Sequence, residues 1–180
     1  AGSGRLTSQL LSRFERVTAI DVSPAQVENA KRILGAAAAR VDFHLVSEPE
    51  IPIPPESADG MFTAEVFQHF SDPAMIDAYL AAAHRALAPG ATICFHVPTA
   101  HVNVYGGLWY RRRRIQTAIE RLVGRRKLME YRLESASRLL STLERIGYVD
   151  CELHAFHVAN HTDRHAYYFA RKAATEARKA

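Results

Sequence analysis

The sequence predicts an α/β fold in which helices cover both faces of a mostly parallel, doubly wound β-sheet that ends in an antiparallel hairpin. Two observations predict it. First, the spacing of apolar residues alternates between the strand and helix types along the chain. Second, the earlier strands are separated by stretches long enough for a helical crossover, whereas the last two are joined by a short loop. With 180 residues, we expect one domain over residues 1–172 and a frayed tail over 173–180.

Composition excludes several classes of protein. The chain is 48% hydrophobic and 23% charged, as ordinary globular proteins are. No apolar run approaches the roughly 18 residues of a membrane span, and residues 1–5 lack the basic and apolar regions of a signal peptide. Two cysteines, Cys94 and Cys151, are too few for a disulfide framework or a zinc finger. We therefore expect a cytoplasmic protein.

The first half of the chain predicts three strands with helices between them. The strands are expected over residues 17–22, 41–46 and 60–67. A short helix is expected over 6–14. A second helix follows Ser23, a typical N-cap residue, with Pro24 at its first position and Gly35 near its end. Four prolines make residues 48–59 an extended loop.

The second half predicts two helices and three strands. Asp72 and Pro73 open a helix that ends in a turn at Pro89 and Gly90. A further helix is expected over residues 135–146. The strands are expected over residues 91–97, 149–156 and 166–171. The last two of these strands form the expected antiparallel hairpin.

One segment carries most of the positive charge. The whole chain has a formal net charge of +4, but residues 101–133 hold nine Lys and Arg residues against two Glu residues, a formal charge of +7. We expect a basic helical insertion here. Its aromatic stretch, Tyr105–Tyr110, and the basic run Arg111–Lys127 fit an acidic or aromatic ligand, an anionic membrane surface, a nucleic acid, or a solvated amphipathic helix. Nucleic acid and membrane are not favoured, because the basic excess is local.

Candidate binding residues stand at the strand ends, where α/β sheets hold their ligands. Gly2 and Gly4 precede a helix, and residues without side chains let the backbone approach a ligand closely. Asp21 ends the next strand, 17 residues after Gly4, and a carboxylate there can accept both hydroxyls of a ribose. The alternative is that Asp21 caps the helix that begins at Pro24. Thr7 stands where a dehydrogenase fingerprint needs a third glycine, which counts against that class.

Several motifs in the same order closely resemble class I S-adenosylmethionine-dependent methyltransferases of the broad small-molecule group. They are AGSGR, VTAIDVSPAQVENAKR, IPIPPESADGMFTAEVFQHFSDP and HRALAPGATICFHVP, which cover roughly residues 1–98, and the closing IGYVDCELHAF and AYYFARK. The resemblance implies a Rossmann-like fold and S-adenosylmethionine as the cofactor. It implies that Gly2 and Gly4 lie against the methionine part, that Asp21 holds the ribose, and that Val22 lies against the adenine.

The sequence departs from the family pattern at two places. The family's glycine motif begins at the end of a first strand, and this chain starts just after that point, so we expect the first strand of the fold to be missing. Its loss leaves an unpaired edge on each side, which implies a longer protein or another chain that fills the gap. The family usually has an Asp near the adenine amino group; here Ser47 and Glu48 stand at that place, and we expect them to take its role.

Candidate catalytic residues follow the third expected strand. S-adenosylmethionine already carries a reactive methyl group, so a protein base is needed only where the acceptor must lose a proton. Glu65 and His69 lie in EVFQHF, where the family often has a histidine. The alternatives are that His69 packs or caps the turn, and that Glu65 binds the cofactor's amino group or faces solvent. His96 lies inside an apolar strand and is expected to be a hydrogen-bonded core residue.

Four C-terminal histidines do not predict a metal site. They are His154, His157, His161 and His165. His154 and His157 are three positions apart, so a strand points them to opposite faces. No cysteine or acidic pair completes a tetrahedral ligand set.

The sequence therefore predicts the transfer of a methyl group from S-adenosylmethionine to a small-molecule acceptor, at an oxygen, nitrogen or carbon atom, by in-line displacement. Two alternatives stay open. One is an RNA or lipid methyltransferase that uses residues 111–127, and the other is a catalytically silent binding module of the same fold. The oligomeric state is not predicted.

Overall fold

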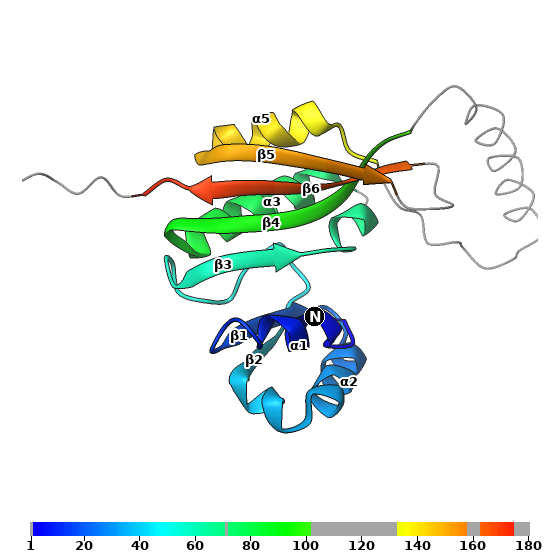
Figure 1. The fold of residues 1–180 in the computed structure, drawn as a ribbon, viewed down its shortest axis with the longest axis vertical. Coiled ribbons are helices and arrows are strands. Elements are labelled where there is room, and N and C mark those ends of the chain that lie inside the picture. Colours follow the sequence, from blue (N-terminus) through cyan, green and yellow to red (C-terminus); the bar gives the residue numbers. More distant parts are fainter. Residues whose placement is uncertain (1, 71, 102–132, 158–162, 175–180) are drawn as a thin grey trace, which may run out of the picture. The chain divides into compact units, whose positions relative to one another are not determined.

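The computed structural model describes residues 2–70, 72–101, 133–157 and 163–174. The chain divides into two compact units, Ala1–Ile53 and Pro54–Ala180, and each is described by itself (Figure 1). The expected basic insertion, with Tyr105–Tyr110 and Arg111–Lys127, lies outside the described residues. So does most of the expected tail, and the single domain over residues 1–172 stays a prediction.

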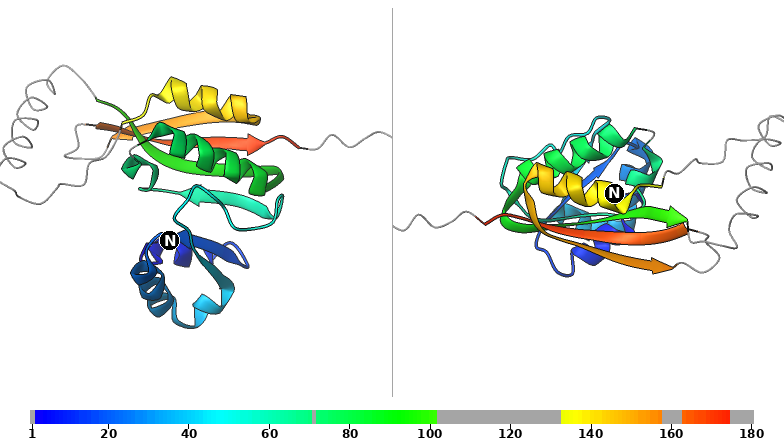
Figure 2. Two further views of the ribbon diagram at one scale, coloured as in Figure 1. Left: turned by 180° about the vertical axis from the view of Figure 1, so that it is seen from behind. Right: turned by 90° about the horizontal axis from the view of Figure 1, so that it is seen from above.

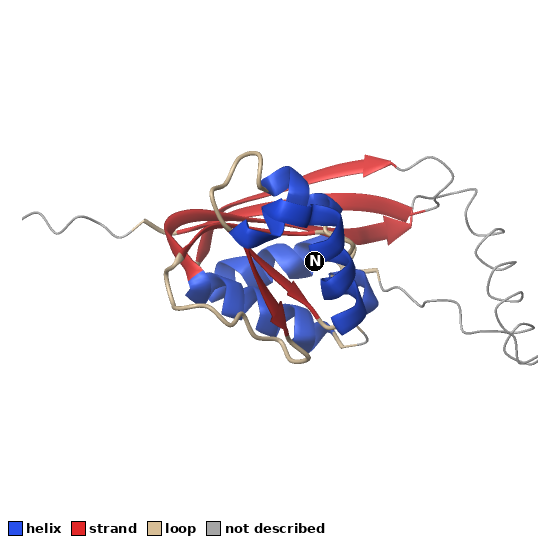
Figure 3. Ribbon diagram, turned by 90° about the horizontal axis from the view of Figure 1, so that it is seen from below, coloured by secondary structure: helices blue, strands red, loops and turns tan. Residues whose placement is uncertain are grey.

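The first unit contains two helices, a 3₁₀ turn and a two-stranded parallel sheet. Its elements are α1 (Arg5–Leu10), β1 (Val17–Asp21), α2 (Pro24–Leu34), η1 (Gly35–Arg40) and β2 (Val41–Leu45). Helix α2 begins as predicted, because the Ser23 hydroxyl accepts a hydrogen bond from the backbone N–H of Gln26. Strands β1 and β2 pair in parallel from Val17 opposite Val41 onward, and Figure 3 shows strands and helices in separate colours.

Helix α1 is shorter than the predicted helix over residues 6–14. It ends at Leu10, and the carbonyls that follow it bind the Arg40 side chain instead of a further helical turn. The Arg40 guanidinium donates to the carbonyl oxygens of Leu11, Phe14 and Glu15 at 3.1, 2.6 and 2.8 Å. A cation beside these unpaired carbonyls stabilises the end of a helix.

The second unit is a four-stranded mixed sheet with two helices on one face. Its elements are β3 (Ala58–Thr63), η2 (Phe67–His69), α3 (Pro73–Ala86), β4 (Leu87–His101), α5 (Ala136–Ile146), β5 (Tyr148–His157) and β6 (Asp163–Lys172). The strand order is β3-β4-β6-β5, with β3–β4 parallel and the other two pairs antiparallel. The predicted C-terminal hairpin is confirmed. Figure 2 shows α3 and α5 side by side on one face of this sheet. No described helix is both long and apolar enough to cross a membrane.

Two boundaries differ from the predictions in this unit. The strand expected over residues 60–67 ends at Thr63, because Glu65 adopts a left-handed backbone with φ of +60° and breaks the extended run. Phe67 then turns into the core, where its ring lies 5.5 Å from that of Phe95. Strand β4 begins at Leu87, directly after α3, whereas a turn at Pro89 and Gly90 was predicted to separate them.

The core of the second unit lies between the sheet and the two helices. Side chains alternate along a strand, so one face of β4 and β6 carries buried apolar residues in a regular series. They are Ile93, Phe95 and Val97 on β4, with Ala166, Tyr168 and Ala170 on β6. The rings of Phe95 and Tyr168 stack with centroids 5.0 Å apart. Leu139 and Leu143 of α5 are fully buried as well, which fixes that helix on the sheet.

The two sheets are separate among the described strands. Strand β1 pairs with β2 alone, and β3 pairs with β4 alone. Each of these strands therefore has one edge with no described partner. That the first strand of the fold is missing from the chain stays a prediction.

Candidate functional site

The glycine turn that precedes α1 adopts a backbone that favours glycine. Gly2 and Gly4 have φ values of +54° and +82°, in the left-handed region that other residues rarely occupy. Gly4 also lies against α2, because a Cβ added to Gly4 would stand 3.1 Å from the Cβ of Ala30. No described atom lies within 4 Å of the corresponding position at Gly2. Gly4 is therefore required by packing, whereas Gly2 leaves space beside the turn.

Asp21 joins this turn to the end of β1. Its Oδ2 accepts a hydrogen bond from the backbone N–H of Gly2 at 2.7 Å, and its Oδ1 accepts one from the N–H of Ser23 at 2.9 Å. Partial burial raises the pKa of Asp21, whereas the N–H groups of Ser23 and Gly2 and the N-terminal amino group lower it, so the pKa lies below its usual value. Asp21 is therefore ionised at neutral pH. The side chain that caps α2 is Ser23, not Asp21.

The other predicted cofactor residues follow the same strand ends. Parallel pairing of β1 and β2 continues past the strands, because the N–H of Val46 donates to the carbonyl of Asp21 at 3.0 Å. Val22 comes directly after β1 and is 69% exposed. Ser47 and Glu48 come after β2 and are exposed. The structure thus brings a fixed carboxylate, an exposed apolar side chain and two polar side chains to one edge of the small sheet.

This edge fits a nucleoside. Each Asp21 oxygen accepts one backbone hydrogen bond, and a carboxylate is the kind of acceptor to which ribose hydroxyls donate. Val22 offers apolar surface for a base, and Ser47 and Glu48 offer acceptors for an amino group. The assignment of these residues to a cofactor stays a prediction.

In the second unit, Glu65 and His69 are linked through Gln68. The Glu65 Oε2 accepts a hydrogen bond from the Gln68 side-chain amide at 2.8 Å. The same amide nitrogen lies 3.4 Å from Nε2 of His69. His69 is exposed and is the last residue of the 3₁₀ turn η2. It was expected directly after the strand, but β3 ends at Thr63, so this turn separates His69 from the strand end. Both side chains are accessible to an acceptor.

Glu65 also contacts a residue that was expected to be structural. Its Oε1 lies 3.3 Å from Nδ1 of His96, which is 2% exposed. Nε2 of His96 lies 3.0 Å from Nδ1 of His165. His96 is buried and hydrogen-bonded as predicted, but it lies on the face of β4 opposite the core residues Phe95 and Val97. Its partner His165 was not predicted, because only the register of β4 against β6 brings the two residues together.

The described residues contain no group of side chains that could hold a metal ion. His154 lies 3.2 Å from the carboxylate of Glu152, at the surface. The side chain of His157 and all of His161 fall outside the described part of the chain. His165 bonds to His96.

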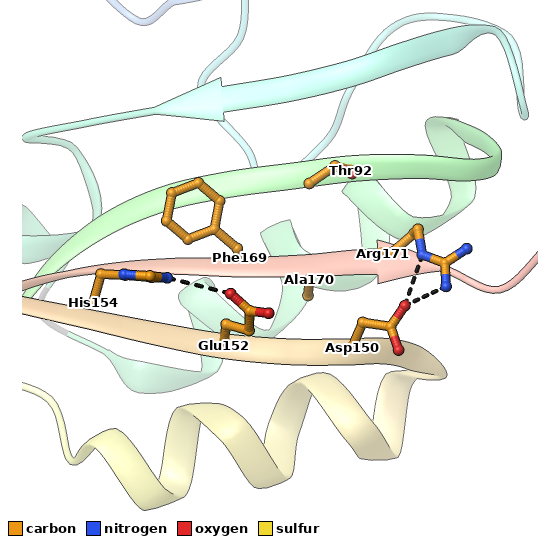
Figure 4. Close-up of a pocket in the computed structure, with 7 residues that line it drawn as sticks. All are labelled: Thr92, Asp150, Glu152, His154, Phe169, Ala170 and Arg171. Atoms are coloured by element: carbon orange, nitrogen blue, oxygen red, sulfur yellow. Dashed lines mark hydrogen bonds and ion pairs between the residues drawn. The ribbon is translucent and has the colours of Figure 1, made fainter.

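A shallow depression of about 310 Å³ lies on β4, β5 and β6 (Figure 4). It is lined by Thr92, Asp150, Glu152, His154, Phe169, Ala170 and Arg171. Arg171 is paired with Asp150, and His154 with Glu152. Each acidic side chain that lines the depression therefore has a basic partner in the same lining. The depression includes none of the predicted site residues.

Comparison with known proteins agrees with the resemblance. Residues 1–90 match the family described as "Methyltransferase domain". Among curated proteins, none matches. Many solved structures share the fold, and three of them are given as examples. A comparison with an S-adenosylmethionine-dependent methyltransferase from Methanosarcina mazei gives a TM-score of 0.71 at 15% identity, covering 97% of this chain and 90% of that one.

The other two structures carry different activities. The N-methyltransferase NodS from Bradyrhizobium japonicum, in complex with S-adenosyl-L-homocysteine, gives a TM-score of 0.66 at 16% identity, covering 94% of this chain and 73% of that one. The [4+2]-cyclase SpnF gives a TM-score of 0.70 at 18% identity, covering 97% of this chain and 73% of that one. At these identities the structures show the fold, and the match over residues 1–90 shows the family. The chain belongs to the methyltransferase domain family.

Proposed function

We propose that the chain methylates a small-molecule acceptor and that its first unit binds the cofactor through Gly2, Gly4, Asp21, Val22, Ser47 and Glu48. The observation that carries the cofactor assignment is the Asp21 carboxylate, which is held between the N–H groups of Gly2 and Ser23 at 2.7 and 2.9 Å. A carboxylate fixed in this way loses little freedom when ribose hydroxyls donate to it. The cytoplasmic location stays a prediction.

In this proposal Glu65 and His69 face the acceptor. When bound, S-adenosylmethionine supplies a methyl group attached to a positively charged sulfur. The leaving group is the neutral thioether that remains. Held by the first unit, the cofactor would supply this methyl group for in-line displacement by the acceptor's nucleophilic atom. The proton that the acceptor loses goes to the Glu65 carboxylate or to the His69 imidazole, both of which are exposed. Proximity supplies most of the rate in such a displacement.

A titration of the full chain tests the cofactor assignment. We expect S-adenosylmethionine and its demethylated product to bind with micromolar dissociation constants, and Asp21→Ala to weaken both roughly tenfold to hundredfold, since hydrogen bonds to a charged group are lost. Asp42→Ala is the matched control, because Asp42 is an exposed carboxylate on β2 that pairs with Arg16. Equal affinity of Asp21→Ala and the unchanged chain contradicts the ribose assignment. Absence of binding by a folded chain favours the silent module.

A second experiment separates the small-molecule acceptor from RNA or lipid. Transfer of a radiolabelled methyl group is measured with panels of small amines, phenols and carboxylic acids, with total RNA, and with anionic vesicles. Transfer to a small molecule that is insensitive to salt between 50 and 200 mM supports the proposal. Transfer to RNA that falls steeply with salt contradicts it, because phosphate contacts release counterions.

A further inference from the structure

One buried amide contacts both side chains that the proposed function places beside the acceptor. The side-chain nitrogen of Gln68 donates a hydrogen bond to Oε2 of Glu65 at 2.8 Å and lies 3.4 Å from Nε2 of His69. Gln68 is 8% exposed, whereas the Glu65 side chain is 68% exposed and His69 is exposed. The proposed function uses the two exposed side chains and gives no role to the buried one.

The 3₁₀ turn η2 holds Gln68 in place. Its neighbour Phe67 is 2% exposed, and the ring of Phe67 lies 5.5 Å from that of Phe95. The backbone N–H of His69 donates to the carbonyl of Val66 at 3.0 Å, which closes the turn. Gln68 therefore presents its amide from a rigid element of the second unit.

The Glu65 carboxylate fixes which end of the Gln68 amide faces the two side chains. An ionised carboxylate accepts hydrogen bonds and has none to donate. Rotating the amide by half a turn would place its oxygen against Oε2 of Glu65, with no hydrogen between the two oxygens. The amide nitrogen therefore faces Glu65, and because this nitrogen carries two hydrogens, the second is available to His69.

This orientation also fixes the role of the His69 ring. The amide nitrogen of Gln68 donates hydrogen bonds and does not accept them, so Nε2 of His69 is the acceptor in their 3.4 Å contact. A neutral imidazole has one N–H, which then lies on Nδ1. The lone pair of His69 is thus already in use, and the ring offers a donor to a neighbouring ligand.

Glu65 keeps one oxygen for a proton. Its Oε2 is held by Gln68, whereas its Oε1 accepts no hydrogen bond from the described residues. Nδ1 of His96 lies 3.3 Å from Oε1 but makes no hydrogen bond to it. No lysine or arginine in the described part of the chain forms an ion pair with Glu65. The carboxylate is therefore oriented without being neutralised.

Stability alone does not explain a glutamine at position 68. The carbonyl oxygen of the Gln68 side chain is buried and has no hydrogen-bond partner within the described ranges, and a buried acceptor without a partner costs free energy. An apolar side chain of the same length would avoid that cost. What the amide gains in return is its contact with Glu65 and His69.

We propose that Gln68 is a positioning residue that divides the roles of its two neighbours, holding Glu65 as the proton acceptor and His69 as a donor that offers Nδ1–H to the methyl acceptor. The inference rests on the proposed function, in which both side chains face the acceptor. The proton that the acceptor's nucleophilic atom loses on methylation passes to the Glu65 carboxylate, which becomes a neutral carboxylic acid and then releases the proton to solvent. Gln68 itself exchanges no proton.

The tautomer of His69 is measured in the unchanged full chain. Ring ¹⁵N shifts distinguish a protonated from an unprotonated nitrogen, and the signals of His69 are those that disappear in His69→Asn. At pH 8 we expect the proton on Nδ1. A histidine side chain that is free in water favours the proton on Nε2, so an Nε2–H signature at His69 overturns the proposal.

A Gln68→Met variant tests whether the amide positions the two side chains. Methionine keeps the length of glutamine and removes both hydrogens of the amide. We expect the His69 proton to move to Nε2, and the ¹³C resonance of the Glu65 carboxyl to shift and broaden. Gln9→Met is the matched control, because Gln9 is an exposed glutamine of α1. An unchanged tautomer and an unchanged resonance in a folded Gln68→Met protein overturn the proposal.

Methyl transfer to the small molecule found in the panel of amines, phenols and carboxylic acids compares the two roles. Glu65→Gln removes the proton acceptor and should lower kcat by about 10²–10⁴-fold. His69→Asn keeps an amide N–H near the position of Nδ1 and should lower kcat by about tenfold or less. The reverse order overturns the proposal.

Failure of the proposed function can be told apart from failure of this inference. If the unchanged chain transfers no methyl group to any acceptor, the proposed function fails. The His69 tautomer and the Glu65 resonance are measured without cofactor or acceptor, so they still decide whether Gln68 holds the two side chains.

Discussion

The backbone N–H of Gly2 donates to Oδ2 of Asp21 at 2.7 Å, a contact between residues 19 positions apart. It ties the glycine turn to the last residue of β1. Because Asp21 also accepts from the N–H of Ser23 at 2.9 Å, one carboxylate orders the start of α1 and the start of α2 together. A side chain that the sequence assigns to ligand binding is therefore also part of the fold of the first unit.

The acid dependence of stability follows from this carboxylate. The folded-state pKa of Asp21 lies below the ordinary value of an aspartate, so ionised Asp21 stabilises the folded chain above the unfolded-state pKa, and this contribution is lost as the pH falls through the folded-state pKa. We expect Asp21→Asn to lower the free energy of unfolding by about 1 kcal/mol at pH 7. The difference from the unchanged chain should shrink between pH 5 and pH 2.5 in urea titrations. A difference that is constant over this range contradicts the assignment.

Gly4 should tolerate alanine less well than Gly2. Both have positive φ, but only Gly4 would place a Cβ against α2, 3.1 Å from that of Ala30. We expect Gly4→Ala to lower the free energy of unfolding by about 2–3 kcal/mol and Gly2→Ala by about 1 kcal/mol, because the second change carries backbone strain without a clash. Thermal unfolding followed by circular dichroism compares them. Equal losses would mean that α2 moves away without cost.

Phe95 is expected to be the most sensitive aromatic residue of the second unit's sheet. It is fully buried and stacks on Tyr168 at 5.0 Å. Phe95→Ala should cost about 3–5 kcal/mol of unfolding free energy, because it removes apolar contacts and leaves a cavity. Phe62→Ala, on β3 with a side chain that is 37% exposed, is the control and should cost about 1 kcal/mol or less. Urea titration at pH 7 measures both.

Burial of His96 should make stability fall in mild acid. Burial holds the folded-state pKa of His96 below the ordinary value of a histidine, although the Glu65 carboxylate opposes it. The unfolded chain therefore binds protons more readily. The free energy of unfolding therefore has its full value above about pH 6.5 and decreases as the pH falls below it. His84 acts in the same direction, because burial and the Lys172 charge lower its pKa while the Gly147 carbonyl opposes them.

His96→Asn should therefore flatten the dependence of the melting temperature on pH between 7 and 5. His84→Gln should flatten it as well, and the double variant more than either. If the melting temperature of His96→Asn falls as steeply as that of the unchanged chain, His96 is not neutral in the folded state. Melting temperatures at half-unit intervals of pH are sufficient to show this.

Much of the fold follows from signals that lie within a few residues of one another. Ser23 with Pro24, Asp72 with Pro73, and Ser135 begin the three longer helices where predicted, because each side chain accepts a hydrogen bond from the first turn of its own helix. The boundaries that were predicted wrongly, at the ends of α1 and β3, depend on residues far away in the sequence. The Arg40 guanidinium binds the carbonyls after α1 from beyond β1 and α2, and Glu65 breaks its strand while contacting β4.

The sequence alone determined the order of the elements, the hairpin, the residues at the ends of β1 and β2, and the family, because capping, alternation and motif spacing are properties of short stretches of chain. Only the tertiary structure decided that β6 lies between β4 and β5, and hence that His165 meets His96 across 69 positions. Strand pairing depends on which distant backbone groups exchange hydrogen bonds, and a shift of one residue would turn either histidine to the opposite face. No local pattern records that register.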